Sequence, residues 1–378
     1  MSAVYIHYPF CTRKCFYCDF YSVNAATFQS DYIDVLCREI EMRLADLDKP
    51  LLSTLFVGGG TPSLMSGKDM EKIMNTLRSN FTFADDAEFS MESNPASLDL
   101  LNLKDYRSAG INRLSIGIQS FIAEELKFLQ RLHSPNEAEA AFEAARKAGY
   151  DNINIDLMFS VPGQTRDSLK YSLEKAIKIA PEHISAYSLI YEQGTPLYKA
   201  AEAGTVSRVD EDNDAENYEL VIDTLTAAGY EQYEVSNFAR QGKQCRHNLK
   251  YWSGDEYFAF GPAAHGYLNN TRYANIRNLA KYTELISAGK LPTDFSEVLT
   301  AENKLAEAIF LGLRSGGLTW QKFRDQFDID VESVSNKLFD ELKKGNFAEI
   351  NETGIKLLKK GYMISDNIAV KIIENTKL

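Results

Sequence analysis

Three cysteines near the N-terminus have the spacing of ligands for an iron–sulfur cluster. Cys11, Cys15 and Cys18 form a C-x3-C-x2-C pattern, and Phe20 occupies the position where a further thiol could have followed. Three thiolates hold three irons of a 4Fe-4S cluster, whereas four would leave no iron open to another ligand. S-adenosylmethionine (SAM) suits the open iron of a reducing cluster because it is a source of radical chemistry. The spacing therefore predicts a 4Fe-4S cluster that binds SAM.

A structural zinc site is the main alternative for these thiols. His7 lies shortly before Cys11 and could complete a Cys3His set. Zinc sites of this kind usually use a second cysteine pair, however, and neither remaining cysteine has a thiol nearby in the sequence. Cys37 falls on the apolar face of a predicted helix, and Cys245, close to His247, stays ambiguous. Five cysteines in a chain of 378 residues without a signal peptide also argue against a disulfide framework.

Composition indicates a globular protein of two or three domains. Hydrophobic residues make up 44% of the 378 residues, which excludes a disordered chain. The net charge of −12 argues against broad binding to nucleic acids or anionic membranes, because both favour an excess of Lys and Arg. The sequence has neither a long apolar run nor a secretory leader. We expect a soluble, cytoplasmic protein without an integral membrane segment.

Short β-rich segments alternate with helical patterns in the first half of the chain, which is typical of a parallel sheet built from βα units. Strands are expected at residues 4–8, 52–57, 88–92, 113–118, 152–158 and 183–189. Helices are expected between them at residues 30–46, 67–79, 98–109, 136–148 and 166–179. Six such repeats can form either an open doubly wound sheet or a barrel, and the pattern alone does not distinguish the two.

Polar or glycine residues follow several of these strands where each strand ends. The run Gly58-Gly59-Gly60-Thr61-Pro62 follows the second strand, and its glycines would let the backbone approach a ligand closely. It matches neither the Walker pattern nor the dinucleotide fingerprint. Glu92 ends the third expected strand, Gln119 follows the fourth, and Asp156 lies late in the fifth. Barrel enzymes place their chemistry at this end of the strands, so the set favours a barrel with a site there.

The second half of the chain follows a different pattern. A helix is expected at residues 214–228, a Tyr-rich strand at 230–235, and a mainly helical stretch from about residue 300 with a β-wing at 361–366. We predict three parts: a barrel core at 1–235, a connecting region at 236–297 and a helical, winged C-terminal domain at 298–378.

Together these features resemble the radical SAM proteins related to oxygen-independent coproporphyrinogen III oxidase, and most closely the heme chaperones among them. The resemblance implies an incomplete (β/α)6 radical SAM barrel with the cluster on Cys11, Cys15 and Cys18. It places Tyr5, Gly59 and Glu92 around the SAM on the open iron. Positions of a second SAM site in the oxidase correspond to Tyr17, Gly60, Thr61, Gln119, Arg131 and Asp156. Whether this chain holds one SAM or two stays open.

Two departures from the oxidase pattern separate the possible functions. The oxidase has a further cysteine at the position of Phe20, and its decarboxylation is thought to need that thiol. The motif His247-Asn248-x-x-Tyr251-Trp252 resembles one linked to heme binding in the chaperones. An imidazole can ligate heme iron while aromatic rings pack on the macrocycle. His247, Tyr251, Trp252 and His265 are therefore the candidate heme-binding residues, whereas His7, His133 and His183 are interpreted as structural.

The preferred function is that of a heme chaperone, which binds heme and transfers it to acceptor proteins while carrying a 4Fe-4S cluster and SAM. The alternative is an oxygen-independent coproporphyrinogen III dehydrogenase that uses radical SAM oxidative decarboxylation. A third possibility is another radical SAM enzyme, for which the chain names no substrate and no catalytic residue. Heme and heme-accepting proteins are the expected partners, no nucleic acid is expected, and a homodimer is left open.

Overall fold

The computed structural model describes residues 2–27 and 31–376, and its central feature is a twelve-stranded mixed sheet. Six parallel strands in the middle of the sheet follow one another in chain order: β1 (Ser2–Tyr8), β4 (Leu51–Gly59), β5 (Thr82–Ser93), β6 (Arg113–Gln119), β7 (Ile153–Phe159) and β8 (His183–Ser188). The sheet does not close on itself, because its order ends at two separate edge strands. The predicted incomplete six-repeat α/β barrel is confirmed.

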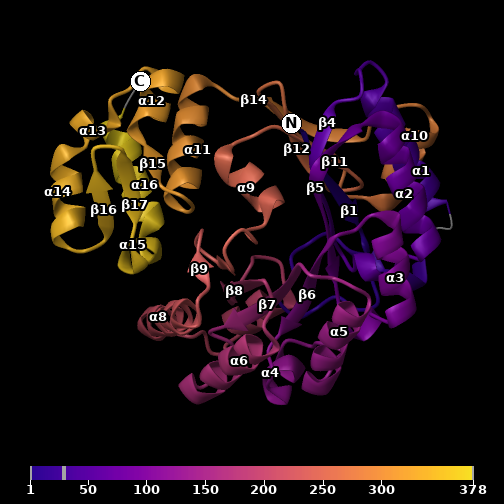
Figure 1. The fold of residues 1–378 in the computed structure, drawn as a ribbon, viewed down its shortest axis with the longest axis horizontal. Coiled ribbons are helices and arrows are strands. Elements are labelled where there is room, and N and C mark those ends of the chain that lie inside the picture. Colours follow the sequence, from indigo (N-terminus) through magenta and orange to yellow (C-terminus); the bar gives the residue numbers. More distant parts are fainter. Residues whose placement is uncertain (1, 28–30, 377–378) are drawn as a thin grey trace.

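Helices cover the outer side of this sheet (Figure 1). They are α1 (Tyr32–Leu44), α2 (Gly67–Asn80), α3 (Leu100–Ala109), α4 (Ala123–Phe128), α5 (Pro135–Lys147) and α6 (Arg166–Ile179). Ser66, Ser134 and Thr165 begin three of them with capping boxes, which satisfy backbone N–H groups of the first turn. The five predicted helices agree with the structure to within two residues at each end. Residue 30, the predicted start of α1, lies outside the described residues, and the short α4 was not predicted.

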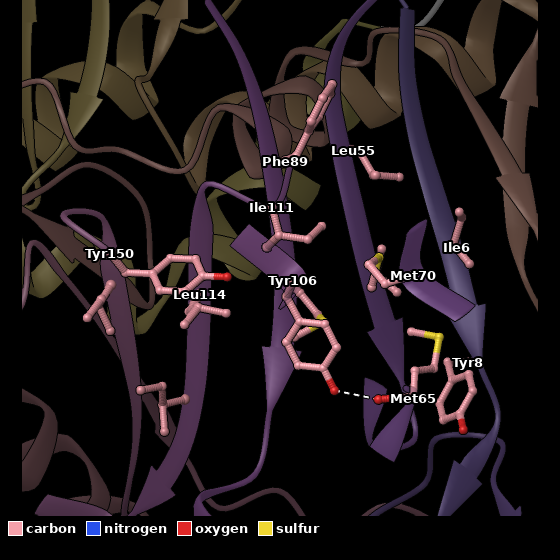
Figure 2. Close-up of a cluster of buried hydrophobic side chains, with 14 of the residues drawn as sticks. Ile6, Tyr8, Leu55, Met65, Met70, Phe89, Tyr106, Ile111, Leu114 and Tyr150 are labelled. Carbon is pink, nitrogen blue, oxygen red and sulfur yellow. Dashed lines mark hydrogen bonds between the residues drawn. The ribbon is translucent and has the colours of Figure 1, made fainter. Parts of the chain in front are cut away.

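The two faces of the parallel strands differ in chemistry. Side chains that point toward the helices are apolar, and they pack with helical residues such as Met70 and Tyr106 into one large core (Figure 2). The Tyr106 hydroxyl donates to the Met65 carbonyl at 2.5 Å, which pairs a polar group inside this core. Register aligns Tyr5 with Phe56, and Glu92 with Ser115, on the inner face. The sheet therefore packs with one face and presents polar groups on the other.

Further strands extend both edges of the parallel sheet. After α7 (Pro196–Glu202) and α8 (Glu211–Ala227), β9 (Glu231–Gln232) and β10 (Asn237–Ala239) continue the sheet beyond β8. On the other edge, β11 (Tyr257–Phe260) runs parallel to β1 and is followed by antiparallel β12 (His265–Leu268), β13 (Thr271–Asn275) and β14 (Thr293–Val298). Helix α10 (Leu279–Ser287) connects the last two strands.

The prediction of one strand at residues 230–235 is wrong. Only Glu231 and Gln232 pair with β10, and the chain bends immediately afterwards. The bend lets the Tyr233 hydroxyl reach His183 at 2.8 Å, and it sets the Val235 N–H against the Arg314 carbonyl at 2.8 Å. Contacts on two different sides of the chain therefore replace regular strand pairing.

The C-terminal part has its own apolar core, built around Trp320, Phe323 and Phe339. It consists of α11 (Ala301–Leu313), β15 (Leu318–Thr319), α12 (Trp320–Phe327), α13 (Val331–Val334), α14 (Asn336–Lys344), β16 (Ala348–Asn351), β17 (Gly354–Leu357), α15 (Lys359–Met363) and α16 (Ser365–Asn375). The three strands form a separate antiparallel sheet in the order β15, β17, β16. The predicted boundaries at 235 and 298 stay predictions. None of the described helices is long and apolar enough to cross a membrane.

The predicted wing at residues 361–366 is wrong, because this segment spans the end of α15 and the start of α16. The wing-like hairpin is β16–β17, which lies just before it. Gly361 serves close packing rather than a hairpin turn, since a Cβ at this position would lie 2.1 Å from the Phe347 carbonyl oxygen.

Candidate cofactor site at the carboxyl ends of the strands

The three predicted cluster ligands lie on one loop after β1. A two-residue parallel pair, β2 (Phe10–Cys11) with β3 (Val23–Asn24), joins the beginning and the end of this loop. The Thr61 hydroxyl donates to Cys11 Sγ at 3.4 Å, and Arg131 Nη1 donates to Cys15 Sγ at 3.4 Å. Burial raises the pKa of the Cys18 thiol to about 11. These thiols would lose their protons on binding metal, because the thiolate is the ligand.

The donor set fits a cluster with an open iron better than the alternative zinc site. The imidazole of His7, the candidate fourth zinc ligand, is already engaged on both sides. Its Nδ1 is hydrogen-bonded to the Tyr5 hydroxyl at 3.1 Å and its Nε2 to the Tyr21 carbonyl at 2.8 Å. The described side chains form no ready-made group of three or more His, Cys, Asp or Glu ligands. Binding of a metal group would therefore require the loop to close, and the three thiols are the sulfur donors that it offers.

The glycine run at the end of β4 allows close packing against the cysteine loop and Glu92. The Gly59 N–H donates to Glu92 Oε2 at 3.1 Å, and a Cβ on Gly58 would lie 3.1 Å from the same carboxylate. Gly59 has a φ of +110°, which favours glycine, and a Cβ there would lie 2.6 Å from the His7 ring. At Gly60 a Cβ would lie 2.6 Å from the Phe10 carbonyl oxygen. Larger residues would push these segments apart.

The carboxyl groups of Glu92 and Asp156 interact electrostatically on the inner side of the sheet. Burial and the negative charge of Asp156 raise the pKa of Glu92 to about 8. Burial also raises the pKa of Asp156, although Asn154 Nδ2 donates to Asp156 Oδ1 at 2.7 Å. Close carboxylates in a buried site disfavour simultaneous ionisation. A cationic ligand group would relieve this repulsion.

Arg131 connects the cysteine loop with the end of β6. Its Nη2 donates to the Gly117 carbonyl at 2.6 Å, while its Nε is buried and has no hydrogen-bond partner among the described residues. The positive charge of Arg131 interacts with Tyr17 and Asp156. Gln119 follows Gly117 with a φ of +69°, a conformation that non-glycine residues rarely adopt and that redirects the chain at the strand end. A Cβ on Gly117 would lie within 3.2 Å of both the Gln119 and Arg131 side chains.

The candidate heme motif lies on a helix in the second half of the chain. It is carried by α9 (Arg246–Ser253), which packs on the inner side of the sheet (Figure 1). His247 is 0% exposed. Its Nδ1 is hydrogen-bonded to the Thr54 hydroxyl at 3.0 Å and its Nε2 to the Tyr251 hydroxyl at 2.8 Å. Trp252 is half-buried on the same helix. The motif is therefore anchored on β4. Burial raises the pKa of Tyr251, and the charge of Glu92 adds to this effect.

Glu88 holds the start of α9, a role that the sequence analysis missed. Cys245 precedes the helix and provides no side-chain cap. The buried Glu88 carboxylate accepts the backbone N–H groups of Arg246 and His247, each at 3.2 Å, and lies 3.5 Å from the Cys245 thiol. A carboxylate is stabilising at a helix N-terminus because of the helix dipole. The one signal of this role in the sequence was the position of Glu88, a charged residue at the start of a predicted strand.

Replacing Glu88 by alanine is expected to lower the free energy of unfolding by about 3 kcal/mol, because two buried N–H groups lose their acceptor. Amide hydrogen exchange in residues 246–253 should accelerate more than exchange elsewhere. Asp86→Ala is the matched control, since this carboxylate also pairs with Arg246 but its side chain is 78% exposed. A control that loses as much stability as Glu88→Ala would disprove the capping role.

The sheet, with a three-cysteine loop after its first strand, defines a radical SAM protein. The family model of the Radical SAM superfamily matches residues 5–176, and that of the HemN C-terminal domain matches residues 299–364. The chain belongs to the HemW family within this superfamily. It is 35% identical to the heme chaperone HemW of Bacillus subtilis over 374 residues, which are 97% of this chain and 98% of that protein.

Two further comparisons agree with this assignment. The heme chaperone HemW of Escherichia coli is 40% identical over 268 residues, covering 70% of this chain and 69% of that protein. The solved structure of the radical SAM enzyme coproporphyrinogen III oxidase (HemN) from Escherichia coli superimposes with a TM-score of 0.85. It is 24% identical, and the match covers 98% of this chain and 90% of that one. The similarity to the oxidase structure shows a shared fold. The HemW relatives confirm the family predicted from the sequence motifs.

Proposed function

We propose that this chain is a heme chaperone that binds heme and transfers it to heme-accepting proteins. The observation that carries the proposal is the match to the Bacillus subtilis heme chaperone along 97% of the chain. Phe20 agrees with it, because this side chain is 65% exposed beside the cysteine loop and supplies no thiol there. This chain therefore lacks the thiol that a decarboxylase would need at this position.

The proposal includes a 4Fe-4S cluster on Cys11, Cys15 and Cys18, with SAM on the open iron. When bound, the reduced cluster can supply an electron for radical chemistry on SAM. The polar groups around the loop have suitable roles. Glu92 would accept hydrogen bonds from the ammonium group, and Arg131 would pair with a carboxylate. Asp156 would accept from ribose hydroxyls or an ammonium.

The remaining proposed SAM contacts come from β1, the cysteine loop and the ends of β4 and β6. They are Tyr5, Tyr17, Gly59, Gly60, Thr61 and Gln119. The heme site is proposed among His247, Tyr251, Trp252 and His265. The Tyr251 ring meets the Tyr257 ring edge-on, with centroids 4.6 Å apart, so aromatic surface extends from α9 onto β11. Flat rings of this kind suit contact with a porphyrin.

A paired assay on one anaerobically reconstituted sample tests the proposal. Heme titration is expected to shift the Soret band, and incubation with an apo-protein acceptor is expected to move heme to that acceptor. Coproporphyrinogen III should not be converted to protoporphyrinogen IX under reducing conditions with SAM. Absence of heme uptake or of transfer would contradict the chaperone function. Sustained porphyrinogen turnover would instead support the dehydrogenase.

A further inference from the structure

The five histidines of the chain differ sharply in whether a metal could reach them. Four are buried and hydrogen-bonded: His7, His133, His183 and His247. His265, at the start of β12, is exposed and has no hydrogen-bond partner among the described residues. Of the imidazoles in the chain, His265 alone offers a nitrogen to an iron that arrives from solvent.

Ligation by His247 would require α9 to leave its place. Ligation through Nε2 would displace the Tyr251 hydroxyl, and moving the buried ring toward a heme would separate it from Phe56, on which it stacks with centroids 5.4 Å apart. The helix itself is held by the Glu88 carboxylate through its first N–H groups. A buried polar group left without a partner destabilises the folded protein. His247 is therefore well suited to positioning α9 and poorly placed to bind iron.

An aromatic strip connects the motif helix with His265. Tyr251 of α9 contacts Tyr257 of β11, and Tyr257 pairs in register with Tyr267 of β12. His265 lies two residues before Tyr267 and shares its face of the strand. The strip places the accessible imidazole at one end of a row of flat side chains. A porphyrin ring packs favourably on such a surface.

The charges around His265 suit an iron porphyrin that carries two carboxylates. Partial burial lowers the pKa of His265, and the positive charges of Arg277 and Arg272 lower it further. The lowered pKa favours the neutral imidazole, which is the form that ligates metals. The side chain of Arg272 is 46% exposed and that of Arg277 is 58% exposed, so both remain open to another carboxylate although they pair with Glu307 and Asp19. Guanidinium groups pair strongly with carboxylates.

Arg277 also joins this surface to the cysteine loop. Its Nη2 donates to the Asp19 carbonyl at 2.6 Å, and Asp19 precedes the exposed Phe20. The Leu279 N–H donates to the Tyr21 hydroxyl at 2.8 Å and fixes the same connection. These two hydrogen bonds thus tie the segment that follows β13 to the part of the cysteine loop that carries Phe20.

We propose that His265 is the axial ligand of the heme iron, that Arg272 and Arg277 pair with the heme propionates, and that Tyr267 and Phe20 contact the macrocycle. This assignment rests on the proposed heme-binding function and names the residues that perform it. His247 acts as a positioning residue for α9. Tyr251 extends the aromatic surface.

Heme titration of the reconstituted full-length chain and its variants tests the assignment. His265→Ala should weaken heme binding on the order of tenfold or more and lose the spectral signature of imidazole ligation. Added free imidazole should restore that signature. His183→Gln is the matched control and should keep the signature, because this histidine is buried and lies outside the proposed heme residues.

A comparison of heme with heme dimethyl ester tests the propionate contacts separately. Arg272→Gln should weaken binding of heme but leave binding of heme dimethyl ester unchanged, because the ester carries no negative charge. Wild-type protein that takes up no heme would overturn the proposed function itself. Wild-type uptake with an unchanged affinity and spectrum in His265→Ala would overturn the ligand assignment alone. An equal loss of the ester and of heme in Arg272→Gln would overturn the propionate contact.

Discussion

Cys15→Ala is expected to abolish assembly of the iron–sulfur cluster. The loop offers three thiols, and the two remaining cysteines, Cys37 and Cys245, are buried. Two thiolates cannot hold three irons of a 4Fe-4S cluster. After anaerobic reconstitution, iron and acid-labile sulfide per chain should fall close to zero, and the electron paramagnetic resonance signal of the reduced cluster should disappear.

Cys37→Ala is the matched control for this experiment. Cys37 is also a free thiol, but it is buried in α1, so its loss should leave the iron and sulfide content unchanged. A reconstituted Cys15→Ala protein with a wild-type cluster signal would refute the three-cysteine assignment. Stoichiometric zinc in the wild-type protein that is lost in Cys15→Ala would support the alternative of a structural zinc site.

The parallel half of the fold was predictable because its signals are local. Apolar alternation marks each strand, and a Ser or Thr cap with its partner three residues later marks the start of several helices. Helix α9 carries no such signal. It spans Arg246–Ser253 and takes its cap from Glu88, which lies 158 residues before Arg246. Contacts over such distances decide the structure without leaving a local pattern.

The candidate site was predictable to the extent that parallel strands place their carboxyl ends together. Glu92 and Asp156 could be brought together by this rule alone. Arg131 lies beyond α4, well after the end of its strand, so its contact with Cys15 depends on how the intervening chain folds. The two candidate heme histidines look alike in the sequence. Their difference is burial, which only the packing of α9 against Thr54 and Phe56 reveals.

Binding of SAM is expected to tighten as the pH rises toward 8. Burial and Asp156 raise the pKa of Glu92 to about 8 in the free protein, so this carboxyl is largely protonated at neutral pH. A bound ammonium group would stabilise the ionised form and lower that pKa. Between the two pKa values each binding event then releases a proton, and affinity should rise by up to about tenfold per pH unit. Above about pH 8 the dependence should flatten.

Isothermal titration calorimetry in buffers of different ionisation enthalpy measures this proton release directly. Glu92→Gln should remove most of the release and the pH dependence, and it should weaken binding, because a neutral amide cannot balance the cationic ligand. Glu234→Gln is the matched control: burial raises the pKa of Glu234 to about 7, yet this residue lies outside the proposed SAM contacts. The control should therefore retain the wild-type proton release. If Glu92→Gln retains it as well, another group carries the proton, and the role of Glu92 as the acceptor for the ammonium group is wrong.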